Sequence, residues 1–175
     1  MKGYSMKHIN QIILLFSLFI TCLSHAVWTP LHQAVKDSNL EQVQKLFAAG
    51  VDDVNVADDY GYTPLHLAVI KGHEPIIELL LEKGANVNVV NQFCYTPLHL
   101  AVIKGNHTIV TLLFVKGKGA KVNVVDWFSD TPLHCATKKN HKVITAFLLD
   151  VGANINAVNK NGWTQLHGAV MNDHK

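Results

Sequence analysis

The chain has 175 residues, of which 49% are hydrophobic and 16% charged, and its 15 basic residues are all lysines set against 13 acidic residues. This near balance leaves no basic excess for nucleic-acid binding, and the lack of arginine removes the bidentate contacts that read bases and phosphates. The three cysteines, Cys22, Cys94 and Cys135, are too few for a disulfide framework.

The first segment of the chain differs from the rest. Lys2 and Lys7 precede an apolar run that ends at Leu23, and the small residues Ser24 and Ala26 follow it. This layout is typical of a secretory signal peptide, and the run is short for a membrane span. We therefore predict a signal peptide at 1–26, cleavage after Ala26, and a periplasmic or extracellular protein with no membrane contact. The alternative is an uncleaved N-terminal membrane anchor.

A six-residue phrase, TPLHLA and its variants, recurs five times after this segment. It starts at Thr29, Thr63, Thr96, Thr131 and Thr164, at intervals of 34, 33, 35 and 33 residues. Periods of this length indicate a solenoid of stacked supersecondary units. We predict one domain over residues 27–175, with units at about 27–57, 58–90, 91–125 and 126–158 and a partial unit at 159–175.

The unit at 58–90 predicts two helices and a turn. Thr63 is a suitable N-cap, and Pro64 suits the first position of a helix. Gly72 ends this helix, and a second apolar helix follows and closes at Gly84. Residues 86–95, NVNVVNQFCY, read as a short extended finger and a turn. Because one helix pair cannot bury its apolar face alone, we predict an all-α repeat solenoid of four to five units.

Residues 58–88 resemble the ankyrin repeat almost letter for letter, and the resemblance extends over 27–175. It implies a helix–turn–helix with a β-hairpin finger in each unit, and a non-enzymatic protein-binding module. Two turn glycines of the pattern are kept at Gly61 and Gly162, whereas Cys94 and Ser129 replace them in the middle units. We expect those two hairpins to be less regular.

The chain contains 11 histidines, five of which occupy the fourth place of the repeated phrase: His32, His66, His99, His134 and His167. Equivalent positions in a solenoid form a ladder with one residue per repeat, whereas a zinc site needs three or four ligands that converge on one ion. We predict no metal and no cofactor. No catalytic motif is present, so we predict no enzymatic activity.

The resemblance to the ankyrin repeat implies that each histidine of the repeated phrase forms hydrogen bonds with the threonine hydroxyl and with nearby backbone. The structural motif consists of Thr63, Pro64, His66, Thr96, Pro97, His99, Thr131, Pro132 and His134. A second set, His73, His107, His141 and His174, reads as turn and capping residues.

The variable positions of the family point from the fingers and first helices into a shared concave surface. Carried over to this chain, they select as a protein-binding surface Tyr60, Tyr62, Ile70, Lys71, Phe93, Tyr95, Ile103, Lys104, Trp127, Phe128 and Trp163. The same positions include Asp59, Gln92, Asp130, Lys138, Lys139, Lys160 and Asn161. We assign Tyr62, Tyr95, Phe128 and Trp163 a common position and expect them to contact the partner. The alternative is that the rings only stack on the next hairpin.

The composition, rich in lysine and asparagine, resembles that of AT-rich bacterial genomes, and secreted ankyrin proteins of host-associated bacteria are similar. This resemblance implies an exported module that engages an unknown protein partner in a host. The alternative is a structural ankyrin protein kept in the cell envelope by its N-terminus.

The two parts of the repeat domain have opposite net charges, −5 for residues 27–90 and +5 for residues 91–175. The first unit has no hairpin before its first helix, and Asp173 and His174 stand where a second helix would begin. We expect frayed terminal repeats and weak, salt-sensitive head-to-tail self-association.

Overall fold

The computed structural model describes residues 28–51 and 53–171. The helices are α2 (Pro30–Lys36), α3 (Leu40–Ala48), α4 (Pro64–Lys71), α5 (Glu74–Glu82), α6 (Pro97–Ile103), α7 (His107–Val115), α8 (Pro132–Lys138), α9 (Lys142–Asp150) and α10 (Gln165–Met171). The predicted signal peptide at 1–26 and the residues Asp173 and His174 lie outside the described residues. None of the described helices is long and apolar enough to span a bilayer.

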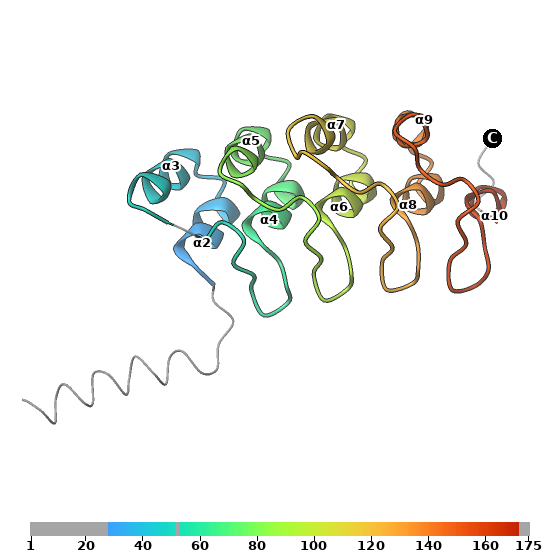
Figure 1. Ribbon diagram of the computed structural model, residues 1–175, viewed down its shortest axis with the longest axis horizontal. Helices are drawn as coiled ribbons and strands as arrows, with labels where there is room; N and C mark the ends of the chain where they lie inside the picture. The colour runs from blue at the N-terminus through green and yellow to red at the C-terminus, as the bar shows by residue number, and fades with distance from the viewer. Residues whose placement is uncertain (1–27, 52, 172–175) are drawn as a thin grey trace, which may run out of the picture.

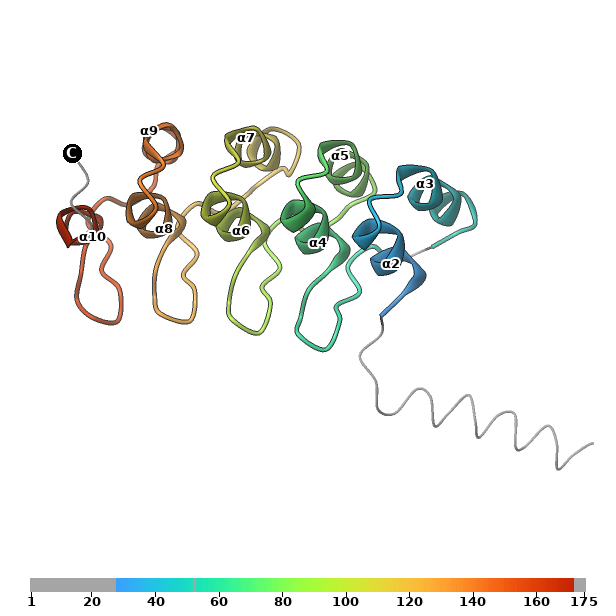
Figure 2. The same ribbon diagram turned by 180° about the vertical axis from the view of Figure 1, so that it is seen from behind.

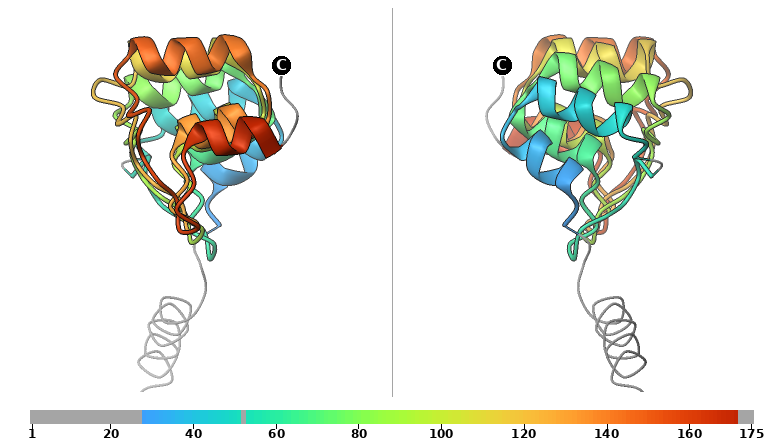
Figure 3. Two further views of the ribbon diagram at one scale, coloured as in Figure 1. Left: turned by 90° about the vertical axis from the view of Figure 1, so that its right-hand side faces the viewer. Right: turned by 90° about the vertical axis from the view of Figure 1, so that its left-hand side faces the viewer.

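The helices form two layers that run side by side along the stack. The inner layer holds α2, α4, α6, α8 and α10, the outer layer holds α3, α5, α7 and α9, and the fingers project from the inner layer (Figures 1 and 2). Viewed down the stack, the fingers overlay one another at an angle to both helix layers (Figure 3). Neighbouring inner helices pack on each other from α2 to α10. The predicted all-helical solenoid is confirmed.

Each inner helix from α2 to α8 begins with the same exchange of hydrogen bonds. In α4 the Thr63 side chain accepts from the backbone N–H of His66, and the His66 ring accepts from the backbone N–H of Thr63 at 3.1 Å. Pro64 occupies the first turn, where its missing N–H leaves no donor unpaired. Gly72 ends the helix in the left-handed conformation, at φ 72°.

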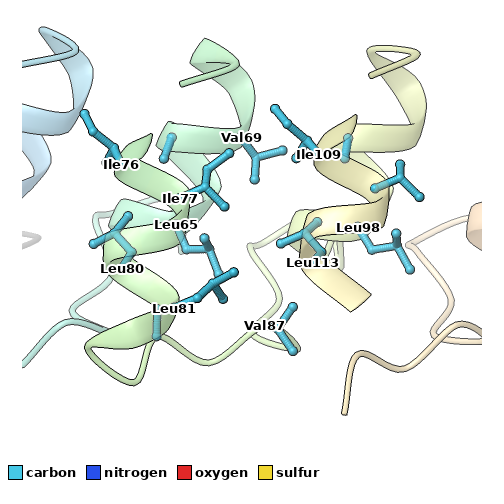
Figure 4. Close-up of a cluster of buried hydrophobic side chains, with 14 of the residues drawn as sticks. Leu65, Val69, Ile76, Ile77, Leu80, Leu81, Val87, Leu98, Ile109 and Leu113 are labelled. Carbon is cyan, nitrogen blue, oxygen red and sulfur yellow. The ribbon is translucent and has the colours of Figure 1, made fainter. Parts of the chain in front are cut away.

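The apolar core fills the space between the two layers and between successive repeats. Leu65 of α4 meets Ile77 and Leu80 of α5, and the next repeat supplies Leu98 and Leu113 (Figure 4). All five side chains are at most 1% exposed. Burying one such side chain contributes about 1.5–3 kcal/mol, so each repeat stabilises the one beside it.

The fingers are tight turns, and the described residues contain no β-strand. In the first finger the Asp58 carboxylate accepts from the backbone N–H groups of Tyr60 and Tyr62 at 2.9 and 2.8 Å. Two backbone hydrogen bonds close the turn, from the Asp58 N–H to the Tyr62 carbonyl and from the Gly61 N–H to the Asp58 carbonyl, each at 2.9 Å. Asn91, Asp126 and Asn159 repeat this pattern, so a side-chain oxygen takes the place of a strand ladder.

The expectation of less regular middle hairpins is wrong. Cys94 and Ser129 both lie at φ 60°, close to Gly61 at 75° and Gly162 at 72°. Each of the four residues donates its backbone N–H to the backbone carbonyl of the Asp or Asn that opens the same turn, at 2.9 Å. The side-chain oxygen of that residue fixes the turn, so a residue with a Cβ is held in the left-handed region at a cost of about 1–2 kcal/mol.

Candidate functional site

The histidines of the repeated phrase join one repeat to the next. The Nε2 of His66 lies 3.0 Å from the Tyr95 carbonyl of the following repeat, and His134 lies 3.0 Å from the carbonyl of Trp163. A carbonyl only accepts, so Nε2 carries the proton and Nδ1 accepts from the threonine of the same repeat. Both ring nitrogens are therefore engaged in structural hydrogen bonds.

Burial favours the neutral form of three of the histidines, His32, His66 and His99. It lowers the pKa of His66 to about 4, against a smaller opposing effect of the Tyr95 carbonyl. It lowers the pKa of His32 and His99 as well. Within residues 28–51 and 53–171, no three His, Cys, Asp or Glu side chains lie together as a metal site would require.

The three described histidines of the second set, His73, His107 and His141, lie at the start of the outer helices. The His73 ring caps α5 by accepting from the backbone N–H of Ile76 at 3.3 Å. His107 is the first residue of α7, where Asn106 is the cap. His141 precedes α9 without a capping hydrogen bond, and its Nε2 is buried with no hydrogen-bond partner.

The predicted aromatic residues other than Trp127 lie in two rows along the fingers. Tyr60, Phe93 and Phe128 form the outer row at the tips, with 59%, 47% and 61% of their surface exposed. Tyr62 and Tyr95 belong to an inner row, where they are half-buried beside the histidines of their own repeats at 5.8 and 5.9 Å between ring centroids.

The assignment of Phe128 to the same position as Tyr62, Tyr95 and Trp163 is wrong. Phe128 follows Asp126 by two residues, as Tyr60 follows Asp58, and so belongs to the outer row. The inner-row position of this finger is Asp130, which is 5% exposed. A count from the Asp or Asn that opens each turn would have given the correct register from the sequence.

An apolar hollow of about 480 Å³ lies between the second and third fingers. Its walls are Gln92, Phe93, Tyr95, Trp127 and Phe128, and we call it the aromatic hollow. The backbone N–H of Trp127 donates to the Phe93 carbonyl at 3.1 Å and joins the two fingers that form it. The sequence predicted each of these rings as a binding residue, and the structure brings them together around one space.

A second hollow of about 280 Å³ adjoins the first, with Tyr95 and Phe128 in both walls. It continues over the inner helices to Ile103 of α6 and Lys139 beside α8. Of the predicted helix residues, Ile70 and Ile103 are half-buried and Lys71 and Lys104 are exposed.

The fourth repeat replaces apolar residues on this surface by charged ones. Asp130 stands where Tyr95 stands one repeat earlier, and Lys138 stands where Ile103 stands. The two residues form an ion pair, and Asn159 donates to the second carboxylate oxygen at 2.9 Å. Sequence analysis placed both on the surface but missed their pairing, although two substitutions of opposite charge in one repeat were a usable signal.

Cys135 lies beside this ion pair but is a poor nucleophile. Burial, and then the carboxylates of Asp126 and Asp130, raise the pKa of its thiol to about 12. The thiolate is the reactive form of cysteine, so this side chain acts as a small apolar group at neutral pH.

The repeats of this chain are similar to repeats in proteins from several organisms. The family model described as ankyrin repeats matches residues 7–91, 31–126 and 98–175. The human ankyrin repeat domain-containing protein SOWAHB is 44% identical over 64 residues, which are 34% of this chain and 8% of that protein. A putative ankyrin repeat protein of fowlpox virus is 46% identical over 56 residues, 32% of this chain and 13% of its own. The Notch-regulated ankyrin repeat-containing protein A of Danio rerio is 42% identical over 55 residues, 31% of this chain and 48% of its own. The matches therefore span less than half of each relative.

Proposed function

Because the chain belongs to the ankyrin-repeat family, whose members are generally protein–protein interaction modules and not enzymes, we propose that it binds a protein partner through its fingers and inner helices. The aromatic hollow is the observation that carries this proposal. Tyr, Trp and Phe side chains lose little entropy on binding and form the energetic centres of many interfaces. An apolar hollow of about 480 Å³ with exposed rings at its rim is suited to a side chain of a partner.

Two double variants of the full chain test this proposal. Phe93→Ala with Phe128→Ala removes two walls of the hollow, whereas Val115→Ala with Val143→Ala changes exposed residues of the outer helices α7 and α9. Partners would be captured on the immobilised full chain, and their affinities measured by calorimetry. We expect the finger variant to weaken binding by roughly 1–3 kcal/mol, with an unchanged melting temperature. Equal losses in both variants, or a lower melting temperature with full affinity, would place binding elsewhere.

Export of the module to a bacterial periplasm or to the exterior, with a host protein as its partner, is part of the same proposal. The N-terminal layout of Lys2, Lys7 and the apolar run supports it. N-terminal sequencing of the protein recovered from its producing cells is the test. A mature chain that starts at Val27 supports export, and an intact Met1 in the membrane fraction supports the envelope-retained alternative.

Head-to-tail self-association is a further part of the proposal, supported by the opposite net charges of residues 27–90 and 91–175. Sedimentation velocity at low and high salt tests it. Association that weakens with salt is the expected result, because exposed charges are screened.

A further inference from the structure

We propose that the partner segment is acidic as well as apolar: one large apolar side chain enters the aromatic hollow, and neighbouring carboxylates meet Lys104 and Lys139, the residues that directly follow α6 and α8. This inference rests on the proposed function, because it describes what the same surface recognises. It adds the chemistry of the partner, which neither the fold nor the family specifies.

Exposed lysines lie beside the two hollows. Lys139 lines the second hollow, and Lys104 directly follows Ile103, which lines it as well; both lysines are exposed. Lys160 lies over the Trp127 ring, with its Nζ 5.1 Å from the centroid. None of these three lysines forms an ion pair with an acidic residue of the described part of the chain.

The two acidic residues that line the second hollow, Asp126 and Asp130, are engaged within the protein. Asp126 is 6% exposed, and one of its carboxylate oxygens accepts two backbone N–H groups at 2.8 and 2.9 Å. Asp130 pairs with Lys138 and accepts from Asn159. Their charges are therefore compensated from inside, whereas the ammonium groups of Lys104 and Lys139 face solvent.

The position of Lys104 and Lys139 at helix ends has a structural benefit of its own. A cation near a helix C-terminus is stabilised by the helix dipole, by about 0.3–1 kcal/mol. That interaction favours the charged lysines at these positions without neutralising them with a carboxylate. An incoming acidic side chain thus meets an ammonium group that has no acidic partner within the described residues.

The two adjoining hollows give the segment a direction. The apolar side chain occupies the space between the second and third fingers, and the 280 Å³ hollow leads from it to Lys139. Carboxylates one to three residues from the apolar side chain would reach the lysines. An extended segment with an apolar residue next to a short acidic run satisfies both parts of the surface.

The test is a random peptide library displayed on phage and selected on the immobilised full chain. Counter-selection on the Phe93→Ala, Phe128→Ala chain retains only peptides that need the hollow. We expect these peptides to combine a large apolar residue with two or more acidic residues. A synthetic peptide of the enriched sequence should bind roughly 3–10-fold more weakly when its glutamates become glutamines, in line with exposed ion pairs. This difference should vanish at 1 M salt, where the Debye length is about 3 Å.

Two charge variants locate the contact. Lys104→Gln with Lys139→Gln should abolish the preference for the acidic peptide over its glutamine form, whereas Lys118→Gln with Lys121→Gln, in the turn after α7, should preserve it. Enrichment of basic or uncharged peptides that still require Phe93 and Phe128 would overturn the inference and leave the proposed function standing. If no peptide distinguishes the wild-type chain from the Phe93→Ala, Phe128→Ala chain, both fail.

Discussion

The inner helices α6 and α10 carry the same phrase but differ in what covers them. Leu98 of α6 is 1% exposed, whereas Leu166, its equivalent in α10, is 72% exposed. His99 is fully buried and His167 is exposed. In the described part of the chain α6 packs between two inner helices, α4 and α8, whereas α10 packs against one inner helix, α8.

The comparison separates what a repeat provides for itself from what its neighbour provides. Thr164 donates its backbone N–H to His167 at 3.2 Å, as Thr96 does to His99 at 3.3 Å, so the start of the helix forms in both. His99 also reaches the Asp130 carbonyl of the next repeat, at 3.3 Å. The local hydrogen bonds follow from the phrase itself, and the burial follows from the next repeat.

The largest expected difference between α6 and α10 is in hydrogen exchange. We expect the amides of α6 to exchange only through global unfolding and those of α10 through local opening. For a domain with a stability of at least 5 kcal/mol, this corresponds to at least a roughly thousandfold slower exchange in α6. Mass spectrometry of peptides from both helices measures the rates. Equal protection would show that α10 is held as firmly as an internal helix.

Truncation of the equivalent leucines should give the next largest effect. Leu98→Ala leaves a cavity between two repeats and should lower the free energy of unfolding by about 2–5 kcal/mol. Leu166→Ala removes an exposed side chain and should change the free energy of unfolding by less than about 0.5 kcal/mol. Urea denaturation measures both. A cost above 1 kcal/mol at Leu166 would mean that its side chain is covered in solution.

Lowering the pH should reduce the free energy of unfolding through the buried His66. The unfolded chain protonates this ring near pH 6.5 and the folded chain only near pH 4. The stability it contributes is complete above pH 6.5 and is lost as the pH falls toward 4, by roughly 3 kcal/mol for a shift of this size. His66→Gln should be less stable at pH 7 and show a shallower loss between pH 6.5 and 4. An unchanged slope between pH 6.5 and 4 in His66→Gln would contradict this account.

The sequence predicts most of the fold because each helix is specified locally. Threonine, proline and histidine fix the start of each inner helix, and the apolar spacing fixes its buried face. The aromatic surface residues followed from the same repeat register. The Lys138–Asp130 ion pair and the shape of the aromatic hollow did not, because they depend on distances between side chains of different elements. The turns at Cys94 and Ser129 were misjudged because the residue type at one position was weighed without the side-chain oxygen that stabilises the turn.

The smallest expected effect compares an internal turn with the terminal one. Ser129 holds φ 60° with a Cβ, whereas Gly162 holds φ 72° at the equivalent place. Ser129→Gly removes the left-handed strain, and after the added entropy of the unfolded chain it should raise the free energy of unfolding by about 0.5–1 kcal/mol. Ser129→Ala keeps the Cβ and should give no gain in the free energy of unfolding.

An added Cβ at Gly162 would meet no atom within 4 Å, so Gly162→Ala tests backbone strain alone. We expect its cost in urea denaturation to stay below about 1 kcal/mol, because α10 opens before the rest of the stack unfolds. A larger cost at Gly162 than the gain at Ser129 would show that the terminal finger unfolds together with the internal repeats.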